Sequence, residues 1–123
     1  MAKQNTAPTM KDVAKEAGVS LGTVSKVING IPVGEEYRKK VEQAIKELDE
    51  IKQQKLWQQG RSKEYYTLIT DTLRKYIEER FGINAMEMTS GEILDLIRKN
   101  SEAQSVYENL RQILQLADFV KFA

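Results

Sequence analysis

The sequence predicts an all-α fold, with an N-terminal three-helix unit followed by a small C-terminal unit of about three helices. Apolar residues recur at steps of three and four along most of the chain, which is the spacing of one helix face. No alternation of apolar and polar residues indicates a strand, and no internal repeat is visible. Several glycines and Pro32 fall between the periodic segments, where they would end helices.

Composition excludes several classes of protein before any motif is considered. The 123 residues include no Cys and no His, which removes disulfides, thiolate metal sites and the commonest general base. No apolar run approaches the ~20 residues of a membrane span, and the N-terminus lacks the apolar core of a signal peptide. We therefore expect a cytoplasmic protein without metal, cofactor or membrane partner.

The net charge of +1 is distributed unevenly. Residues 1–40 contain seven Lys and Arg against four Asp and Glu, whereas residues 41–123 contain twelve against fourteen. A mildly basic N-terminal part is compatible with contacts to phosphate groups. A local excess of this size also arises in ordinary domains, so the charge alone does not indicate a nucleic acid.

Residues 1–8 have no periodicity, and we expect them to form a flexible tail. Thr9 follows and is placed to cap a first helix over residues 10–17, because its side chain can accept a hydrogen bond from a first-turn amide. Gly18 can adopt the left-handed backbone that commonly ends a helix. The pattern therefore predicts a short helix that stops at Gly18.

A second short helix is predicted over residues 21–29, with Ser20 as its cap. Two short helices joined by a Gly-containing turn of three or four residues form a helix-turn-helix. The outward face of the second helix consists of Gly22, Thr23, Ser25, Lys26 and Asn29. Such small and hydrogen-bonding side chains suit close approach to a polyanion, so DNA binding is the function that this stretch predicts.

A third helix is predicted from Glu35 to at least Leu48, after a loop that contains glycine and proline breakers. Its apolar residues would close a three-helix core, and they are Tyr37, Val41, Ala44, Ile45 and Leu48. Residues 50–61 are rich in Gln and Lys, and we expect either a helical extension or a linker there. Residues 9–49 would then form one domain and residues 62–123 another.

The C-terminal part begins with a long amphipathic helix, predicted over residues 62–80 and stopped by Gly82. Thr89 and Glu92 have the spacing of a capping box, which predicts the start of a short helix. A last helix is predicted over residues 102–120. The all-α assignment therefore covers the second half of the chain as well.

Residues 14–29 also carry a longer pattern, A-x3-G-V-S-x2-T-V-S-x-V-x-N. This pattern resembles the DNA-binding headpiece of the LacI/GalR (lactose-repressor) family, and the similarity extends over residues 9–49. The resemblance implies sequence-specific binding to double-stranded DNA and a role in bacterial transcriptional regulation. It agrees with the helix-turn-helix that the local pattern predicts.

A recognition helix lies in the major groove with its N-terminal residues facing base edges. By the resemblance, the base contacts are Leu21, Gly22 and Lys26. The expected phosphate contacts are Thr9, Met10, Ser20, Thr23, Ser25, Asn29 and Arg38. Two alternatives stay open: Leu21 packs inward instead of touching a thymine methyl, and Arg38 belongs to an ordinary solvated face.

The chain departs from the family after Asp49, where the headpiece is normally followed by a hinge helix and a large effector-binding domain. Only 74 residues follow in this sequence, and we expect no small-molecule effector. One headpiece binds DNA mainly non-specifically, and specificity would need a dimer. We therefore consider a homodimer formed through residues 50–123. Aromatic residues there serve either an interface or the core: Trp57, Tyr65, Tyr66, Phe81, Phe119 and Phe122.

Residues 56–123 are weakly similar to the cytosolic C-terminal domain of BatD-like bacterial membrane proteins, through R-F-G-I, T-S-x-E-I-L and A-D-x-V-K-F patterns. This similarity implies no biochemical role. An alternative function is therefore an all-α adaptor that acts through residues 62–123, in a chain that joins two unrelated segments by natural or engineered fusion. An enzyme is not expected, because the chain lacks His, Cys and a Gly-rich phosphate loop.

Overall fold

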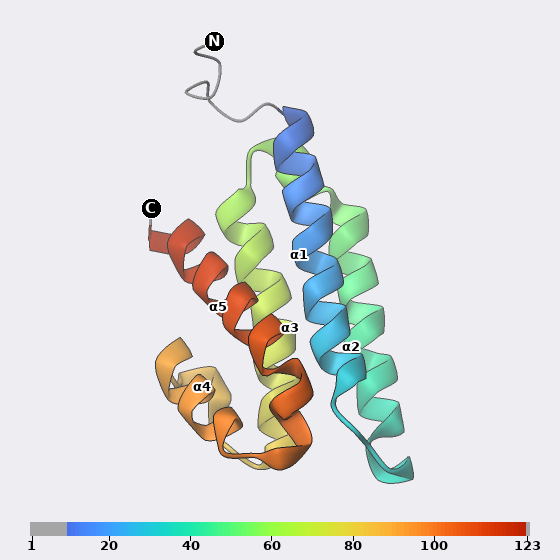
Figure 1. Cartoon of the computed structure of the whole chain (residues 1–123). Helices are drawn as coiled ribbons and strands as arrows, with labels where there is room; N and C mark the ends of the chain where they lie inside the picture. Colours follow the sequence, from blue (N-terminus) through green and yellow to red (C-terminus); the bar gives the residue numbers. More distant parts are fainter. Residues whose placement is uncertain (1–9, 123) are drawn as a thin grey trace.

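The structure, a computed structural model, describes residues 10–122, and side chains from residue 15 onward. Its α-helices are α1 (Met10–Gly30), α2 (Glu35–Gln54), α3 (Ser62–Phe81), α4 (Ser90–Arg98) and α5 (Tyr107–Phe122). Short 3-10 segments lie at Leu56–Gln59, Ala85–Glu87 and Ser101–Val106. Figure 1 shows α1 and α2 side by side, with α3 and α5 packed against α1 and with α4 beside α5 at the end of the molecule away from the N-terminus.

The all-α prediction is confirmed, and no strand occurs within residues 10–122. α2 begins at Glu35 as expected and runs beyond Leu48 to Gln54, where Lys55 adopts a left-handed backbone with φ of 53°. The extension predicted after residue 49 is therefore helical, and it continues as a 3-10 segment whose Leu56 is buried. This segment packs on the core and is not a free linker.

The C-terminal helices follow their predicted signals closely. α3 ends at Phe81, and Gly82 adopts the left-handed backbone that terminates it. The capping box before α4 is present with both of its hydrogen bonds. The last helix was expected from residue 102, but the chain forms a 3-10 segment up to Val106 before α5 begins.

The predicted turn at Gly18 is absent, which corrects the expected division of the N-terminal unit. α1 is one helix of 21 residues that covers both predicted helices, and Ser20 lies inside it instead of capping a second helix. The reason is that the buried residues of α1 form one stripe at steps of three and four that passes straight through this point. They are Ala17, Ser20, Val24, Val27 and Ile28.

A single hydrophobic core joins the N-terminal and C-terminal parts. The buried side chains of α1 belong to the same cluster as those of α2, α3, α4 and α5. Separate folding of residues 9–49 and 62–123 thus stays a prediction, and the shared core is the feature against which it must be tested. Exposing either half alone would uncover apolar surface that the other half now buries.

Two further contacts fix the end of α1 and the loop after it. A Cβ added to Gly30 would lie 2.4 Å from Cγ1 of Val106, so the glycine allows α1 to touch the segment before α5. The guanidinium of Arg80 donates to the Pro32 carbonyl at 2.9 Å and pairs with Glu102 at 2.8 Å. It also lies 5.0 Å from the ring centroid of Tyr37.

Candidate nucleic-acid interface

The solvent-exposed face of α1 is the surface that the sequence assigns to DNA. Gly18, Gly22, Lys26 and Asn29 are exposed, and their steps of four, four and three place them on one side of the helix. The buried stripe of α1 occupies the opposite side. α1 can therefore present this face to a partner while its other side stays in the core.

The three predicted base contacts differ in their accessibility. Gly22 and Lys26 are exposed, and a Cβ added to Gly22 would meet no heavy atom within 4 Å. The backbone at Gly22 thus permits the close approach that a groove wall requires. Leu21 is half-buried and packs against the core, as in the alternative left open for it.

Three predicted phosphate contacts lie on this face or at its edges, and they form hydrogen bonds within their own helix. Thr23 Oγ1 donates to the Val19 carbonyl at 3.0 Å, and Asn29 Nδ2 donates to Ser25 Oγ at 3.2 Å. Both hydrogen bonds are solvent-exposed, so they can exchange for bonds to phosphate oxygens at little cost. The Ser25 hydroxyl accepts in this pair and keeps its proton for another acceptor.

Ser20 is in a different position from the other candidates. It is 2% exposed, and its hydroxyl lies 2.9 Å from the hydroxyl of Tyr66 on α3. In the straight α1, Ser20 can reach neither a phosphate nor the amides of a second helix start. Thr9 lies outside the described residues, and the side chain of Met10 is also outside them.

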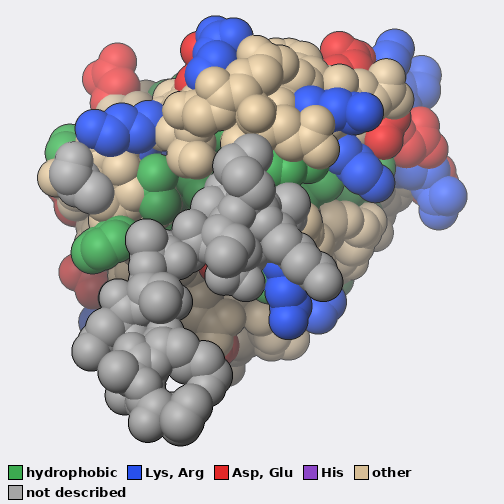
Figure 2. Space-filling view, turned by 90° about the horizontal axis from the view of Figure 1, so that it is seen from above, with side chains coloured by type: hydrophobic (Ala, Val, Ile, Leu, Met, Phe, Trp, Pro, Cys, Tyr) green, Lys and Arg blue, Asp and Glu red, His purple; other side chains and the backbone are tan. Residues whose placement is uncertain are grey.

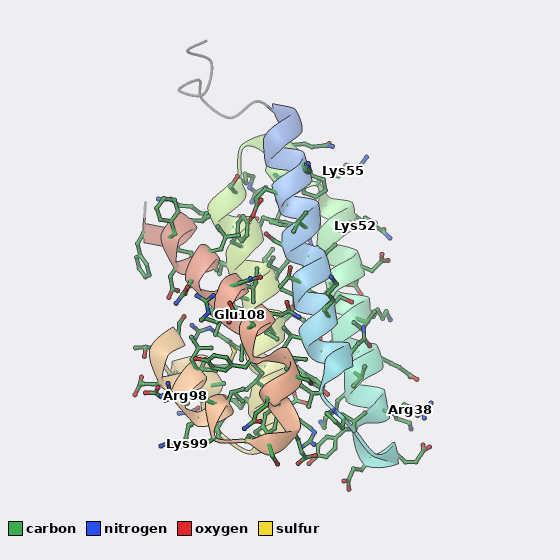
Figure 3. All side chains as sticks on the ribbon, viewed as in Figure 1. Arg38, Lys52, Lys55, Arg98, Lys99 and Glu108 are labelled. Atoms are coloured by element: carbon green, nitrogen blue, oxygen red, sulfur yellow. The ribbon has the colours of Figure 1, made fainter. Side chains whose placement is uncertain are left out.

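Arg38 lies on α2, close to the C-terminal end of α1. Figure 3 shows it projecting outward from the lower part of α2, where it forms an exposed ion pair with Glu35 at 3.6 Å. Arg38 and Asn29 line the same shallow surface hollow beside the α1–α2 loop. Two candidate phosphate contacts from different helices are therefore neighbours, while Lys26 lies about one turn before Asn29 in α1.

The charge distribution does not by itself single out a face. Figure 2 shows Lys and Arg side chains interspersed with Asp and Glu around the end of the molecule from which it is viewed. Within residues 15–122, Lys40 pairs with Glu79 and Arg61 with Glu64, so part of the positive charge is neutralised locally. A polyanion would be attracted by local geometry more than by a strong overall field.

Two tyrosines of α3 lie beneath α1 in the core, which is one of the two roles left open for them, but their contacts with α1 were not predicted. Tyr65 and Tyr66 are 1% and 5% exposed, and their rings meet edge to face with centroids 5.5 Å apart. Burial raises the pKa of Tyr65 to about 12, with the neighbouring Tyr66 adding to the rise. Burial likewise raises the pKa of Tyr66, although the hydrogen bond with Ser20 acts in the opposite direction. Both hydroxyls therefore remain protonated, and so able to donate, at neutral pH.

Other kinds of site find little support in the described part of the chain. The side chains of residues 15–122 bring together no group of three His, Cys, Asp or Glu suited to a metal ion. None of the helices within residues 10–122 combines the length and the apolar character that a bilayer crossing requires. The exposed face of α1 stays the best-defined candidate surface.

Comparison with known proteins supports the N-terminal assignment. Residues 9–50 match the family described as bacterial regulatory proteins, lacI family. The chain is 60% identical over 43 residues to the HTH-type transcriptional regulator RegA of Clostridium saccharobutylicum, which covers 34% of this chain and 13% of that protein. It is 57% identical over 44 residues to RegA of Clostridium acetobutylicum, covering 35% of this chain and 13% of the relative.

The extent of these matches limits what they establish. The chain spans only about an eighth of the length of these curated relatives, and the family match ends at residue 50. No solved structure matches the chain. The similarity of residues 56–123 to BatD-like proteins stays a prediction. The N-terminal third of the chain, residues 9–50, is therefore related to the DNA-binding segment of lacI-family bacterial regulators.

Proposed function

We propose that this protein binds double-stranded DNA through the exposed face of α1 and acts in bacterial transcriptional regulation. The observation that carries the proposal is the exposure of Gly22 and Lys26 on one face of a helix within the lacI-family match. Lys26 would donate to guanine O6 and N7 or to a phosphate, and Gly22 would let the helix backbone approach the groove wall. Thr23, Ser25 and Asn29 would hold the phosphate backbone.

Arg38 would extend this footprint from α2, where it shares a surface hollow with Asn29. Leu21 would contribute packing more than a base contact, because it is half-buried against the core. The proposal includes no catalysis, no cofactor and no small-molecule effector. It implies that the protein works in the cytoplasm, where bacterial DNA is located.

The test is a salt titration of binding to a duplex, with two variants on the face and two matched variants away from it. Gly22→Glu is expected to weaken binding at least about tenfold, because a carboxylate would be placed against the phosphates. Lys26→Ala is expected to weaken binding by about tenfold and to reduce the salt slope by about one ion.

The controls preserve the chemistry of each change at a different place. Gly91→Glu alters another exposed helical glycine with open space around it, and Lys52→Ala removes an exposed lysine of α2 that Figure 3 shows pointing outward. Both controls are expected to bind DNA like the wild type. Wild-type affinity of Gly22→Glu at low salt would refute the proposed function.

A homodimer formed through residues 50–123 is part of the proposal. Two recognition helices must lie about 34–36 Å apart to read successive major grooves on one side of a duplex. Support comes from Phe119 and Phe122, which are 73% and 81% exposed in the last turn of α5. Aromatic side chains exposed to this degree are typical of an interface more than of a monomer surface.

The same two side chains also favour the second candidate function, an adaptor that binds another protein. A Phe119→Ser, Phe122→Ser double variant separates the two possibilities when solution mass and duplex affinity are measured together. Conversion from dimer to monomer with weaker DNA binding supports the homodimer. An unchanged mass and an unchanged affinity would mean that Phe119 and Phe122 do not form a homodimer, and would favour a contact with a different protein.

A further inference from the structure

The stretch of α1 from Ala17 to Ser20 is poorly suited to the middle of a straight helix. Gly18 contributes no packing, since a Cβ added to it would meet nothing within 4 Å, and glycine weakens a helix interior relative to alanine. Val19 is 56% exposed to solvent. Ser20 places a polar hydroxyl in the buried stripe. Gly18 and Ser20 would be more favourable at a turn, where glycine is unrestrained and serine caps a helix.

Two tyrosines of α3 compensate for this in the straight form. Tyr65 Oη donates to the Ala17 carbonyl at 2.8 Å, and Tyr66 Oη lies 2.9 Å from Ser20 Oγ. Trp57 packs edge-on against Tyr65 with ring centroids 5.5 Å apart, which holds that ring in place. We call this pair of contacts, Tyr65–Ala17 and Tyr66–Ser20, the tyrosine clasp.

The two contacts of the clasp have different consequences. The Ala17 carbonyl has an intrahelical partner while α1 continues, and it would need an outside partner if α1 ended near Gly18. The Tyr65 bond can form in either case, so it is compatible with both arrangements. The Tyr66 bond is not equivalent, because it directs the Ser20 hydroxyl sideways toward α3. A capping serine directs that oxygen along the helix axis, to the amide two or three residues further on.

We infer that α1 is a two-state element whose straight, clasped form is the resting state. In the second state α1 opens at Gly18 into two helices, Ser20 leaves Tyr66 to cap the second helix, and this open form is the one that fits duplex DNA. The inference rests on the proposed DNA-binding function. Because Val24, Val27 and Ile28 are fully buried, the second half of α1 stays in the core and the first half moves.

The opening has a direct consequence for affinity. A protein that must leave its resting state to bind has an apparent affinity reduced by the fraction of molecules in the competent state. Gly18→Ala favours the straight helix and disfavours the left-handed turn, so DNA binding should weaken roughly tenfold. Tyr66→Phe leaves the buried Ser20 hydroxyl without its partner in the resting state, so DNA binding should strengthen roughly fivefold.

Matched controls distinguish opening from a general change in stability. Gly91→Ala introduces the same methyl group at a helical glycine of α4 that also has open space around it. Tyr76→Phe removes a buried hydroxyl that has no hydrogen-bond partner among the described residues. Both controls should leave the affinity for DNA unchanged. An effect of Gly91→Ala equal to that of Gly18→Ala would contradict a hinge at residue 18.

A distance measurement tests the opening independently of affinity. The chain has no Cys, so Glu16→Cys and Lys52→Cys allow spin labels at two exposed positions outside the proposed DNA contacts. Without further substitutions, the doubly labelled protein should give one label-to-label distance when free and a different one with a 20-base-pair duplex. The distance changes because the first half of α1, which carries one label, moves. Tyr66→Phe should add the second distance without DNA.

The outcomes separate this inference from the proposed function. If the protein binds the duplex while the distance stays unchanged, the straight helix itself is the binding form and the inference is wrong. If the wild type binds no duplex, the proposed function fails, and the DNA-free Tyr66→Phe protein decides whether α1 opens. A single unchanged distance in that variant would then refute the opening as well.

Discussion

Ser20 in α1 and Thr89 before α4 are both hydroxyl residues that were predicted to cap a helix, but only Thr89 does so. Thr89 Oγ1 accepts a hydrogen bond from the Glu92 amide at 3.1 Å, and Glu92 Oε1 accepts one from the Thr89 amide at 2.9 Å. Ser20 instead lies inside α1 and bonds to Tyr66. Three residues after Ser20 the chain has Thr23, whose side chain bonds back to Val19.

The two sites differ in how much stabilisation the cap provides compared with the stabilisation from the packing around it. A reciprocal capping box satisfies two helix-end donors at once, whereas a single hydroxyl satisfies one. At Ser20 the opposing contribution is a buried stripe of α1 that continues on both sides of Gly18. Burial of Ala17 together with the Ser20–Tyr66 hydrogen bond opposes one cap of about 1 kcal/mol.

The largest effect is therefore expected from weakening that stripe. Ile28 is fully buried, and Ile28→Ala should lower the free energy of unfolding by about 2–5 kcal/mol through lost burial and the remaining cavity. Chemical denaturation should give one transition for the whole chain, because the core is shared. Val19→Ala, at a 56% exposed position of the same helix, should change stability by no more than about 0.5 kcal/mol.

Two separate transitions in the wild type would show that residues 9–49 and 62–123 fold independently after all. An Ile28→Ala cost no greater than that of Val19→Ala would mean that the α1 stripe contributes little to the stability of the shared core. Either result would shift the balance between local signals and packing in favour of the local signals.

A smaller effect is expected at the C-terminal end of the same helix. Gly30→Ala would place a Cβ 2.4 Å from Cγ1 of Val106, a β-branched side chain that is itself buried. We expect a loss of about 1–3 kcal/mol in the free energy of unfolding from this overpacking. The double variant with Val106→Ala should recover part of the loss, and additive losses would contradict a direct contact.

Whether an element could be predicted from the sequence depends on the same distinction between local signals and packing of distant residues. The end of α3 at Gly82 and the start of α4 at Thr89 depend on residues within one turn of each boundary, so local rules found them. The exposed face of α1 was also found, because Gly22, Lys26 and Asn29 share a helical side in either a bent or a straight helix. These features need no knowledge of distant contacts.

The features that were missed depend on residues far apart in the chain. Ser20 meets Tyr66 across 46 positions, and the Gly30 contact with Val106 is equally non-local. A window of ten or fifteen residues contains only one partner of each pair, so it cannot indicate either contact. The sequence could therefore predict which face of α1 is polar, but not whether α1 bends or which of the two roles left open for Leu21 it has.

The next prediction removes the cap that is used. Thr89→Ala should lower the free energy of unfolding by about 1 kcal/mol, because the Glu92 amide loses its partner at the start of α4. Thr89→Ser keeps the hydroxyl and should retain most of the stability. Thermal and chemical denaturation of both variants provide the measurement, and equal stability of Thr89→Ala and wild type would show that the box contributes nothing.

The smallest effect is a pH dependence of the same cap. The hydrogen bond from the Thr89 backbone amide holds the pKa of the Glu92 carboxyl below its ordinary value, and the Thr89 side chain acts in the same direction. A carboxyl whose pKa is lower in the folded state stabilises the fold above its unfolded pKa, and this contribution is lost as the pH falls through the folded pKa. The stability difference between wild type and Glu92→Gln should therefore be constant near neutral pH and shrink below about pH 4. Urea denaturation of both proteins across this range measures it, with Thr89→Ala as the control in which the dependence should be weakened. A difference that stays constant down to low pH would mean that the Glu92 carboxylate does not hold the start of α4.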